Sequence, residues 1–209
     1  MESPVRGVGM SVRVIETFGY DGRFQRLDRH LARAAATCAG LGYPFERMDV
    51  LVALDALPHA GPLRVRMTVG SAGDVEVTHA PMTATPDVWR VAVSDQRLVS
   101  DDPWLQVKTT ERGLYDRVRA GMAAGVEEVI FLNERGAVCE GTITNIFFDA
   151  GEGLCTPPLA CGLLPGVLRA EMLENGVCRE AVLRGEDLAR VKLWVGNSLR
   201  GMIVAKVIE

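Results

Sequence analysis

Lysine is scarce in this chain. Only three of its 23 basic residues are lysines, at Lys108, Lys192 and Lys206, and the others are arginines. The formal net charge of −4 argues against nucleic acid or an anionic membrane surface as a partner. The arginine content is explained either by codon composition or by recognition of anions, because a guanidinium group binds phosphate or carboxylate through paired hydrogen bonds.

Histidine is also scarce, and the five cysteines are scattered along the chain. No pair among His30, His59 and His79 lies near a Cys-x-x-Cys motif, so we expect no structural zinc site. The odd number of cysteines among apolar neighbours indicates reduced, buried thiols in a cytoplasmic protein. No run approaches the roughly 20 apolar residues of a membrane span. The segment Met1–Pro4 lacks the features that open a signal peptide.

Helix and strand patterns are mixed in both halves of the chain. Apolar residues recur at helical spacing over 24–41, 46–57, 109–124 and 165–176. Strand patterns cover 11–18, 63–69, 75–77, 89–93, 129–132, 137–139, 143–148 and 193–195. The mixture predicts an α+β protein.

Two prolines and little hydrophobic periodicity mark the segment 80–87. We therefore predict a linker over 81–88. It would join a small N-terminal domain of residues 1–80 to a larger, β-rich C-terminal domain of residues 89–209.

Lys108 is the sole lysine among the first 191 residues. It lies between the apolar residues Leu105 and Val107 and the predicted helix start at Thr109. Burial penalises an ammonium ion and lowers its pKa, and a neutral amine is a nucleophile. Considered alone, a lysine is more often a solvated surface residue, and that alternative stays open.

Glu140 precedes a predicted buried strand, in the segment Glu140-Gly141-Thr142-Ile143-Thr144-Asn145. A carboxylate at the entrance to such a strand needs a cationic or hydrogen-bonding partner, and a pyridinium nitrogen is one possibility. An exposed turn residue is the ordinary alternative. A lysine that can form an imine and a carboxylate that can hold a pyridinium proton are the two groups that a pyridoxal phosphate enzyme requires of its protein.

Two further segments are suited to anions. Pro165-Gly166-Val167-Leu168 opens a predicted helix, and the first N–H groups of a helix are free to bind phosphate. Any helix start has such groups. Arg26, Arg29 and Arg33 share one side of the first predicted helix, which is also typical of a solvated face. The pattern alone does not choose among these arginines.

In their order and spacing these segments resemble the class IV aminotransferases. These are the fold-type IV pyridoxal phosphate enzymes, which include branched-chain and D-amino acid aminotransferases and 4-amino-4-deoxychorismate lyases. The resemblance is strongest over 133–147 (NERGAVCEGTITNIF) and 156–167. It is completed by Ile15-Glu16-Thr17, Leu27–Leu31, Lys108-Thr109-Thr110 with Tyr115-Asp116, and Gly196–Gly201.

The resemblance implies a role for each candidate residue. Lys108 would be the Schiff-base lysine, Glu140 would pair with the pyridine nitrogen, and Arg29 would bind the phosphate. The other implied contacts of the cofactor and its pocket come from Thr144, Asn145, Gly166, Val167, Leu168 and Ser198.

The resemblance also implies a two-domain fold, a homodimer and a small amine or amino acid as substrate. The Lys-Thr-Thr, Leu-Leu-Pro-Gly and Asn-Ser-Leu-Arg-Gly segments are most similar to the lyase-type domain. The first hypothesis is therefore an aminodeoxychorismate lyase that releases pyruvate and forms 4-aminobenzoate. An amino acid aminotransferase is the second hypothesis, and a non-catalytic cofactor-binding protein is the third.

The sequence departs from the family pattern in three places. Leu168 stands where many members have threonine, which would leave only its amide for the phosphate. Glu111 stands where arginine is common. A segment like the family's N-terminal Tyr-Gly-Asp-Gly is missing, so substrate identity is the least specified property.

Overall fold

The computed structural model describes residues 12–58 and 60–208. The segment Met1–Pro4, where we expected no signal peptide, lies outside the described residues, as do Ser11, His59 and Glu209. Among the described residues, no helix has both the length and the hydrophobicity that crossing a membrane requires.

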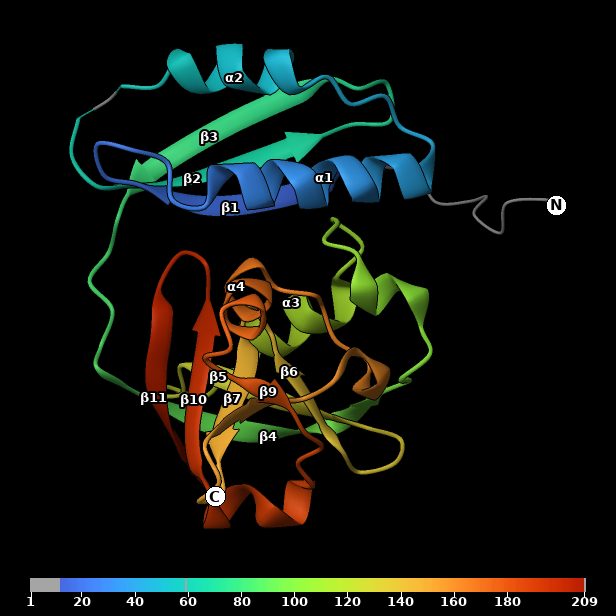
Figure 1. Cartoon of the computed structure of the whole chain (residues 1–209), viewed down its shortest axis with the longest axis vertical. Helices are drawn as coiled ribbons and strands as arrows, with labels where there is room; N and C mark the ends of the chain where they lie inside the picture. Colours follow the sequence, from blue (N-terminus) through green and yellow to red (C-terminus); the bar gives the residue numbers. More distant parts are fainter. Residues whose placement is uncertain (1–11, 59, 209) are drawn as a thin grey trace, which may run out of the picture.

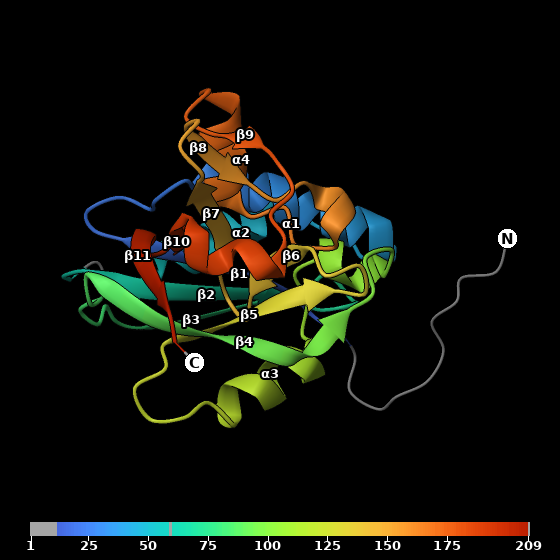
Figure 2. The same cartoon turned by 90° about the horizontal axis from the view of Figure 1, so that it is seen from below.

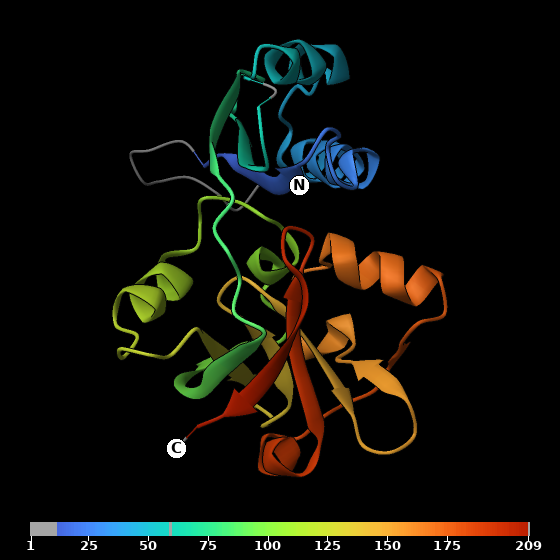
Figure 3. The same cartoon turned by 90° about the vertical axis from the view of Figure 1, so that its left-hand side faces the viewer.

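The N-terminal part is a three-stranded antiparallel sheet covered by two helices (Figure 1). Its strands lie in the order β1 (Val14–Tyr20), β2 (Leu63–Val69) and β3 (Val75–Pro81). Helices α1 (Leu27–Leu41) and α2 (Arg47–Asp55) cover the same face of this sheet (Figure 3). Apolar residues from all these elements form one buried core between sheet and helices.

The two faces of β1 have different surroundings, because alternate residues of a strand point to opposite sides. Phe18 and Glu16 lie on the helix side, where Phe18 joins the core and Glu16 contacts α1. Thr17 lies on the other side, directly opposite Arg66 of β2 in the antiparallel register. This second side forms one wall of the cavity described below.

The C-terminal part is built on a closed sheet (Figure 2). Six strands form the ring, in the order β10 (Lys192–Asn197), β11 (Gly201–Val207), β4 (Val88–Leu98), β5 (Glu128–Asn133), β6 (Val138–Gly141) and β7 (Asn145–Asp149). Strand β7 also pairs with β10, which closes the ring. Strands β8 (Leu154–Thr156) and β9 (Arg179–Glu180) extend the sheet beyond β7. Closure pairs the edges of the sheet and encloses an apolar core.

Short helices complete this part of the fold. They are α3 (Gly113–Ala120), α4 (Val167–Glu174) and the 3-10 helices Pro103–Gln106, Leu159–Cys161 and Gly185–Arg190. The predicted α+β class, with a small N-terminal part and a larger β-rich part, is confirmed. The segment 82–87 connects β3 to β4 along one side of the molecule (Figure 1).

The helix expected over 109–124 begins later, at Gly113. The preceding residues instead pair with β1. The N–H of Ile15 donates to the carbonyl of Lys108 at 2.8 Å, and the N–H of Thr110 donates to the carbonyl of Arg13 at 2.9 Å. This short ladder attaches the Lys108 segment to the N-terminal sheet.

Candidate active site

A cavity of about 380 Å³ lies where the N-terminal sheet meets the loops of the closed sheet. Seven of the nine candidate residues line it: Lys108, Glu140, Thr144, Asn145, Gly166, Val167 and Ser198. They come from segments that are far apart in the chain. The cavity is therefore a tertiary feature to which both parts of the fold contribute.

Lys108 is half-buried in the cavity wall, and its main chain is held by β1. Burial of the ammonium group, followed by the positive charge of Arg33, lowers the pKa of Lys108 to about 8. The carboxylate charges of Glu16 and Glu140 oppose this change only in part. A larger share of this amine than of an ordinary lysine is therefore neutral near pH 7.

Glu140 is the penultimate residue of β6 and is 6% exposed. Its Oε1 accepts a hydrogen bond from the Tyr115 hydroxyl at 2.6 Å, and its Oε2 accepts one from the N–H of Leu164 at 3.0 Å. Burial raises the pKa of Glu140 to about 7, although both hydrogen bonds and the charge of Lys108 oppose the rise. A cation entering the cavity would stabilise the ionised form.

Glu128 anchors the loop that follows Glu140. The side chain is fully buried and accepts hydrogen bonds from the N–H groups of Thr142 (2.9 Å) and Ile143 (3.1 Å). It also accepts them from the hydroxyls of Thr142 and Thr144. This carboxylate fixes the loop that carries Thr144 and Asn145 into the cavity wall. Sequence analysis missed it, since nothing in the strand pattern marks Glu128 as buried.

The substitution Glu128→Gln is expected to lower the free energy of unfolding by about 2–4 kcal/mol. An amide can accept at one position only, and its NH₂ would face the hydrogen-bond donors of the loop. Urea unfolding of the purified protein measures the change. The control is Glu152→Gln, because Glu152 is 82% exposed in its pair with Arg179 and should change stability little. Equal stability of the two variants would contradict the anchoring role.

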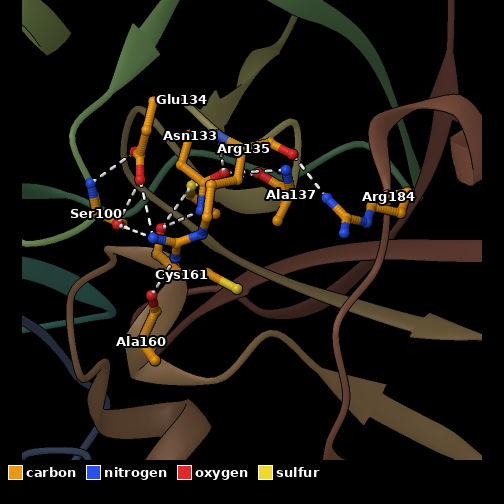
Figure 4. A network of polar contacts seen from close by, with 9 residues as sticks. Ser100, Asn133, Glu134, Arg135, Ala137, Ala160, Cys161 and Arg184 are labelled. Carbon is orange, nitrogen blue, oxygen red and sulfur yellow. Dashed lines mark hydrogen bonds and ion pairs between the residues drawn. The ribbon is translucent and has the colours of Figure 1, made fainter.

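A second polar network surrounds the turn between β5 and β6 (Figure 4). The fully buried Asn133 donates to the carbonyl of Cys161 at 2.9 Å and accepts from the N–H groups of Arg135 and Ala137. Arg135 donates to the carbonyl of Ala160 at 2.8 Å. The Asn-Glu-Arg-Gly motif thus ties the β5–β6 turn to the segment that leads to Leu164, and its role here is structural.

One corner of the cavity is suited to an anion. Gly166 and Val167 begin α4, whose first N–H groups have no partners within the helix. A Cβ atom at position 166 would overlap the carboxamide of Asn145, so only glycine allows this close approach. Ser198 and Arg33 complete the corner.

Two of the expected contact residues, Arg29 and Leu168, are not among the residues that line the cavity. Arg29 is displaced to the surface, where it pairs with Glu174 at 2.7 Å and its side chain is 35% exposed. Arg33, one turn further along α1, lines the cavity instead and donates to the carbonyl of Pro165 at 3.2 Å. The side chain of Leu168 packs into an apolar cluster with Phe147.

Arginines from several segments form a further part of the cavity wall. Arg64 and Arg66 of β2 line it together with Arg112 and Arg200. Partial desolvation and then the like charge of Arg112 lower the pKa of Arg66. Arg112 pairs with Asp116 at 2.7 Å. Within the described chain, no ion pair joins the other three to a carboxylate, so this wall carries excess positive charge.

The comparisons with known proteins agree with the sequence resemblance. Residues 13–208 match the family model described as amino-transferase class IV. A Schizosaccharomyces pombe protein named as a candidate aminodeoxychorismate lyase is 31% identical over 174 residues, covering 80% of this chain and 75% of that protein. The aminodeoxychorismate lyase of Bacillus subtilis is 30% identical over 189 residues, covering 78% of this chain and 64% of that protein.

A solved structure is similar over nearly the whole chain. It is a candidate amino-acid aminotransferase from Mesorhizobium loti, with a TM-score of 0.90 and 41% sequence identity. The match covers 94% of this chain and 100% of that chain. The expected fold-type IV architecture is thereby confirmed.

Proposed function

Since the chain belongs to the class IV aminotransferases, which are pyridoxal phosphate enzymes, we propose that it is a lyase acting on 4-amino-4-deoxychorismate. The products would be pyruvate and 4-aminobenzoate. The observation that carries the proposal is the pairing of Lys108 and Glu140 in one cavity, where each affects the ionisation of the other. The names of the Schizosaccharomyces pombe and Bacillus subtilis relatives support the choice of reaction.

The residues present fit the cofactor. Bound pyridoxal phosphate supplies an aldehyde that condenses with amines and a ring that withdraws electrons. Lys108 offers an amine with a lowered pKa for the aldehyde. Glu140, which is buried and forms no ion pair within 4 Å among the described residues, would hold the proton on the ring nitrogen. The corner formed by Arg33, Gly166, Val167 and Ser198 would hold the phosphate.

In the reaction, the protein groups position the substrate and move protons. Lys108, when its amine is free, would act as the general base and then as the acid. Its proton transfers let pyruvate leave while the ring of the product becomes aromatic. The backbone of Lys108 is held by β1, so its amine has a defined position at the cavity wall.

The arginine wall favours a substrate with more than one carboxylate. Arg64, Arg66 and Arg200 carry charges that a monocarboxylate would leave largely uncompensated. Aminodeoxychorismate carries two carboxylates. An aminotransferase is the second candidate function, favoured by the 41% identity to the Mesorhizobium loti protein. We further propose a homodimer in the cytoplasm.

Pyruvate release tests the choice between the two functions. Purified protein with pyridoxal phosphate is mixed with aminodeoxychorismate in the absence of any oxo acid. A lyase forms pyruvate and 4-aminobenzoate in equal amounts over many turnovers. An aminotransferase without an acceptor stops after one turnover, and an absence of pyruvate rejects the lyase.

The pH dependence of cofactor capture tests the role of Lys108. With a pKa of about 8, the neutral fraction of the amine rises about tenfold per pH unit below pH 8 and then levels off. The rate at which cofactor-free protein captures pyridoxal phosphate should follow the same curve. Stopped-flow absorbance measures this rate. A rate that keeps rising to about pH 10, as for an ordinary lysine, would contradict the perturbed pKa.

A further inference from the structure

A chain of buried polar groups leads from β1 to the anion corner of the cavity. The Nδ1 of His30 lies 2.6 Å from Oε2 of Glu16, and its Nε2 lies 2.7 Å from Oγ of Ser198. Glu16, His30 and Ser198 are 0%, 1% and 6% exposed. Solvent therefore does not interrupt this chain of hydrogen bonds. At the anion corner the chain ends in the hydroxyl of Ser198.

The proton on Nδ1 of His30 can be assigned. Burial alone would raise the pKa of Glu16, but the charge of Arg33 and the hydrogen bond from His30 lower it below its ordinary value. Arg33 donates to both oxygens of this carboxylate, at 2.9 and 2.7 Å. An ionised carboxylate only accepts hydrogen bonds, so Nδ1 of His30 must carry a proton.

The protonation of Nε2 then decides which way the Ser198 hydroxyl points. If His30 is neutral, Nε2 is an acceptor, Ser198 donates its proton to it, and only oxygen lone pairs face the cavity. If His30 is a cation, Nε2–H donates to Oγ of Ser198, and the hydroxyl proton is free to donate into the cavity. Only the second arrangement is favourable for a bound oxyanion.

We propose that His30 is a positioning residue that takes up a proton when an oxyanion binds at Ser198, and thereby turns the Ser198 hydroxyl toward the anion. This inference rests on the proposed function, in which the anion is the phosphate of the cofactor. The proton comes from solvent, and no covalent bond changes.

The charges around His30 agree with this coupling. On β1 and α1, the charges of Glu16 and Arg33 compensate each other. Arg26 donates to the carbonyl of Ser198 at 3.1 Å but is paired with Glu171 of α4 at 2.6 Å. The ring of Phe18 forms an apolar wall 5.1 Å from the His30 ring. A positive charge on His30 would share the Glu16 carboxylate with Arg33, and a bound anion would provide a second negative charge.

Lys108 is the remaining cation to consider, because its charge interacts with Glu16 and Arg33. It would oppose protonation of His30 while it is itself charged. Binding of an anion near both groups offsets this repulsion. The experiment therefore repeats the measurement in the Lys108→Ala protein, where the coupling should persist.

Sulfate is a suitable probe for cofactor-free protein, because it keeps two negative charges across the neutral range. Any proton taken up on binding is therefore taken up by the protein and not by sulfate. Calorimetry at pH 8 in buffers of different ionisation enthalpy should show uptake approaching one proton per sulfate. The ¹⁵N spectrum of His30 should change from a single neutral tautomer to the imidazolium form.

Variants separate positioning from a merely structural role. In the Lys108→Ala background, where Lys108 takes up no proton, Ser198→Thr keeps the hydroxyl and should keep the proton uptake, whereas Ser198→Ala and His30→Gln should lose it. The matched control is His79→Gln, since His79 is exposed on β3 and should leave uptake unchanged. If sulfate does not bind, or binds while His30 stays neutral, the inference is wrong. If cofactor cannot be trapped on Lys108 yet sulfate still protonates His30, the proposed function fails and this inference stands.

Discussion

Replacing Lys108 by alanine is expected to lower kcat for pyruvate release by at least about 1,000-fold. The variant loses both the amine that attaches the cofactor and the base that moves protons at the substrate. Lys108 is the only lysine that lines the cavity among the described residues, so no neighbour can replace it. Steady-state assays with saturating cofactor measure the effect.

Two matched controls accompany this variant. Lys192 lies on β10 and Lys206 on β11, and both are exposed and lie outside the cavity. Lys192→Ala and Lys206→Ala should retain nearly full activity. Borohydride reduction of the loaded wild-type protein, followed by peptide mass analysis, should find the cofactor on Lys108. An adduct on either control lysine, or activity within tenfold of wild type in Lys108→Ala, would reject the assignment.

The elements with regular local patterns could be predicted from the sequence. Helix α1 was expected over 24–41 and covers Leu27–Leu41, where Gly42 ends it with a left-handed φ of 73°. Strand β2 occupies the predicted range, Leu63–Val69. In both elements the apolar period matches the buried face, so local sequence and tertiary environment favour the same structure.

The elements that depend on distant partners could not be predicted. Thr109 and Thr110 resemble a helix cap, but the N–H and hydroxyl of Thr110 are used by Arg13 of the N-terminal part. Strand β11 was missed, although it pairs with both β10 and β4. Strands β8 and β9 have three and two residues, too few for a period to be recognised. All of these elements form by pairing with segments that are distant in the sequence. Local patterns carry no information about such pairing.

The same distinction applies to the site. Lys108 and Glu140 were predicted because their residue types fit the chemistry and the segments resemble a family, and both line the cavity. Arg29 was expected at the phosphate, but α1 is oriented so that Arg33 reaches the cavity. The position of Glu16 could have indicated which arginine faces inward, because Glu16 shares the inward face of β1 with Val14 and Phe18. A buried acid there requires a basic partner from the helix above it.

The substitution Glu140→Gln is expected to lower kcat about 100- to 1,000-fold while leaving the fold intact. Glutamine has nearly the same shape and still accepts a hydrogen bond, but it cannot carry the charge that holds a proton on the ring nitrogen. Tyr115→Phe, which removes only the 2.6 Å hydrogen bond to Glu140, should have a smaller effect in the same direction. Steady-state assays of both variants, with cofactor content measured separately, give the comparison.

Stability distinguishes this loss of function from misfolding. The pKa of Glu140 is raised from 4.5 to about 7 in the folded protein, so the folded state binds this proton more tightly than the unfolded chain does. Stability is therefore lost as the pH rises from about 4.5 to about 7, by roughly 3 kcal/mol from this group. Glutamine has no such loss. Cofactor-free Glu140→Gln should thus be at least as stable as wild type at pH 8, with the difference disappearing near pH 4. A variant that is inactive and also less stable at pH 8 would mean that Glu140 supports the fold rather than the cofactor.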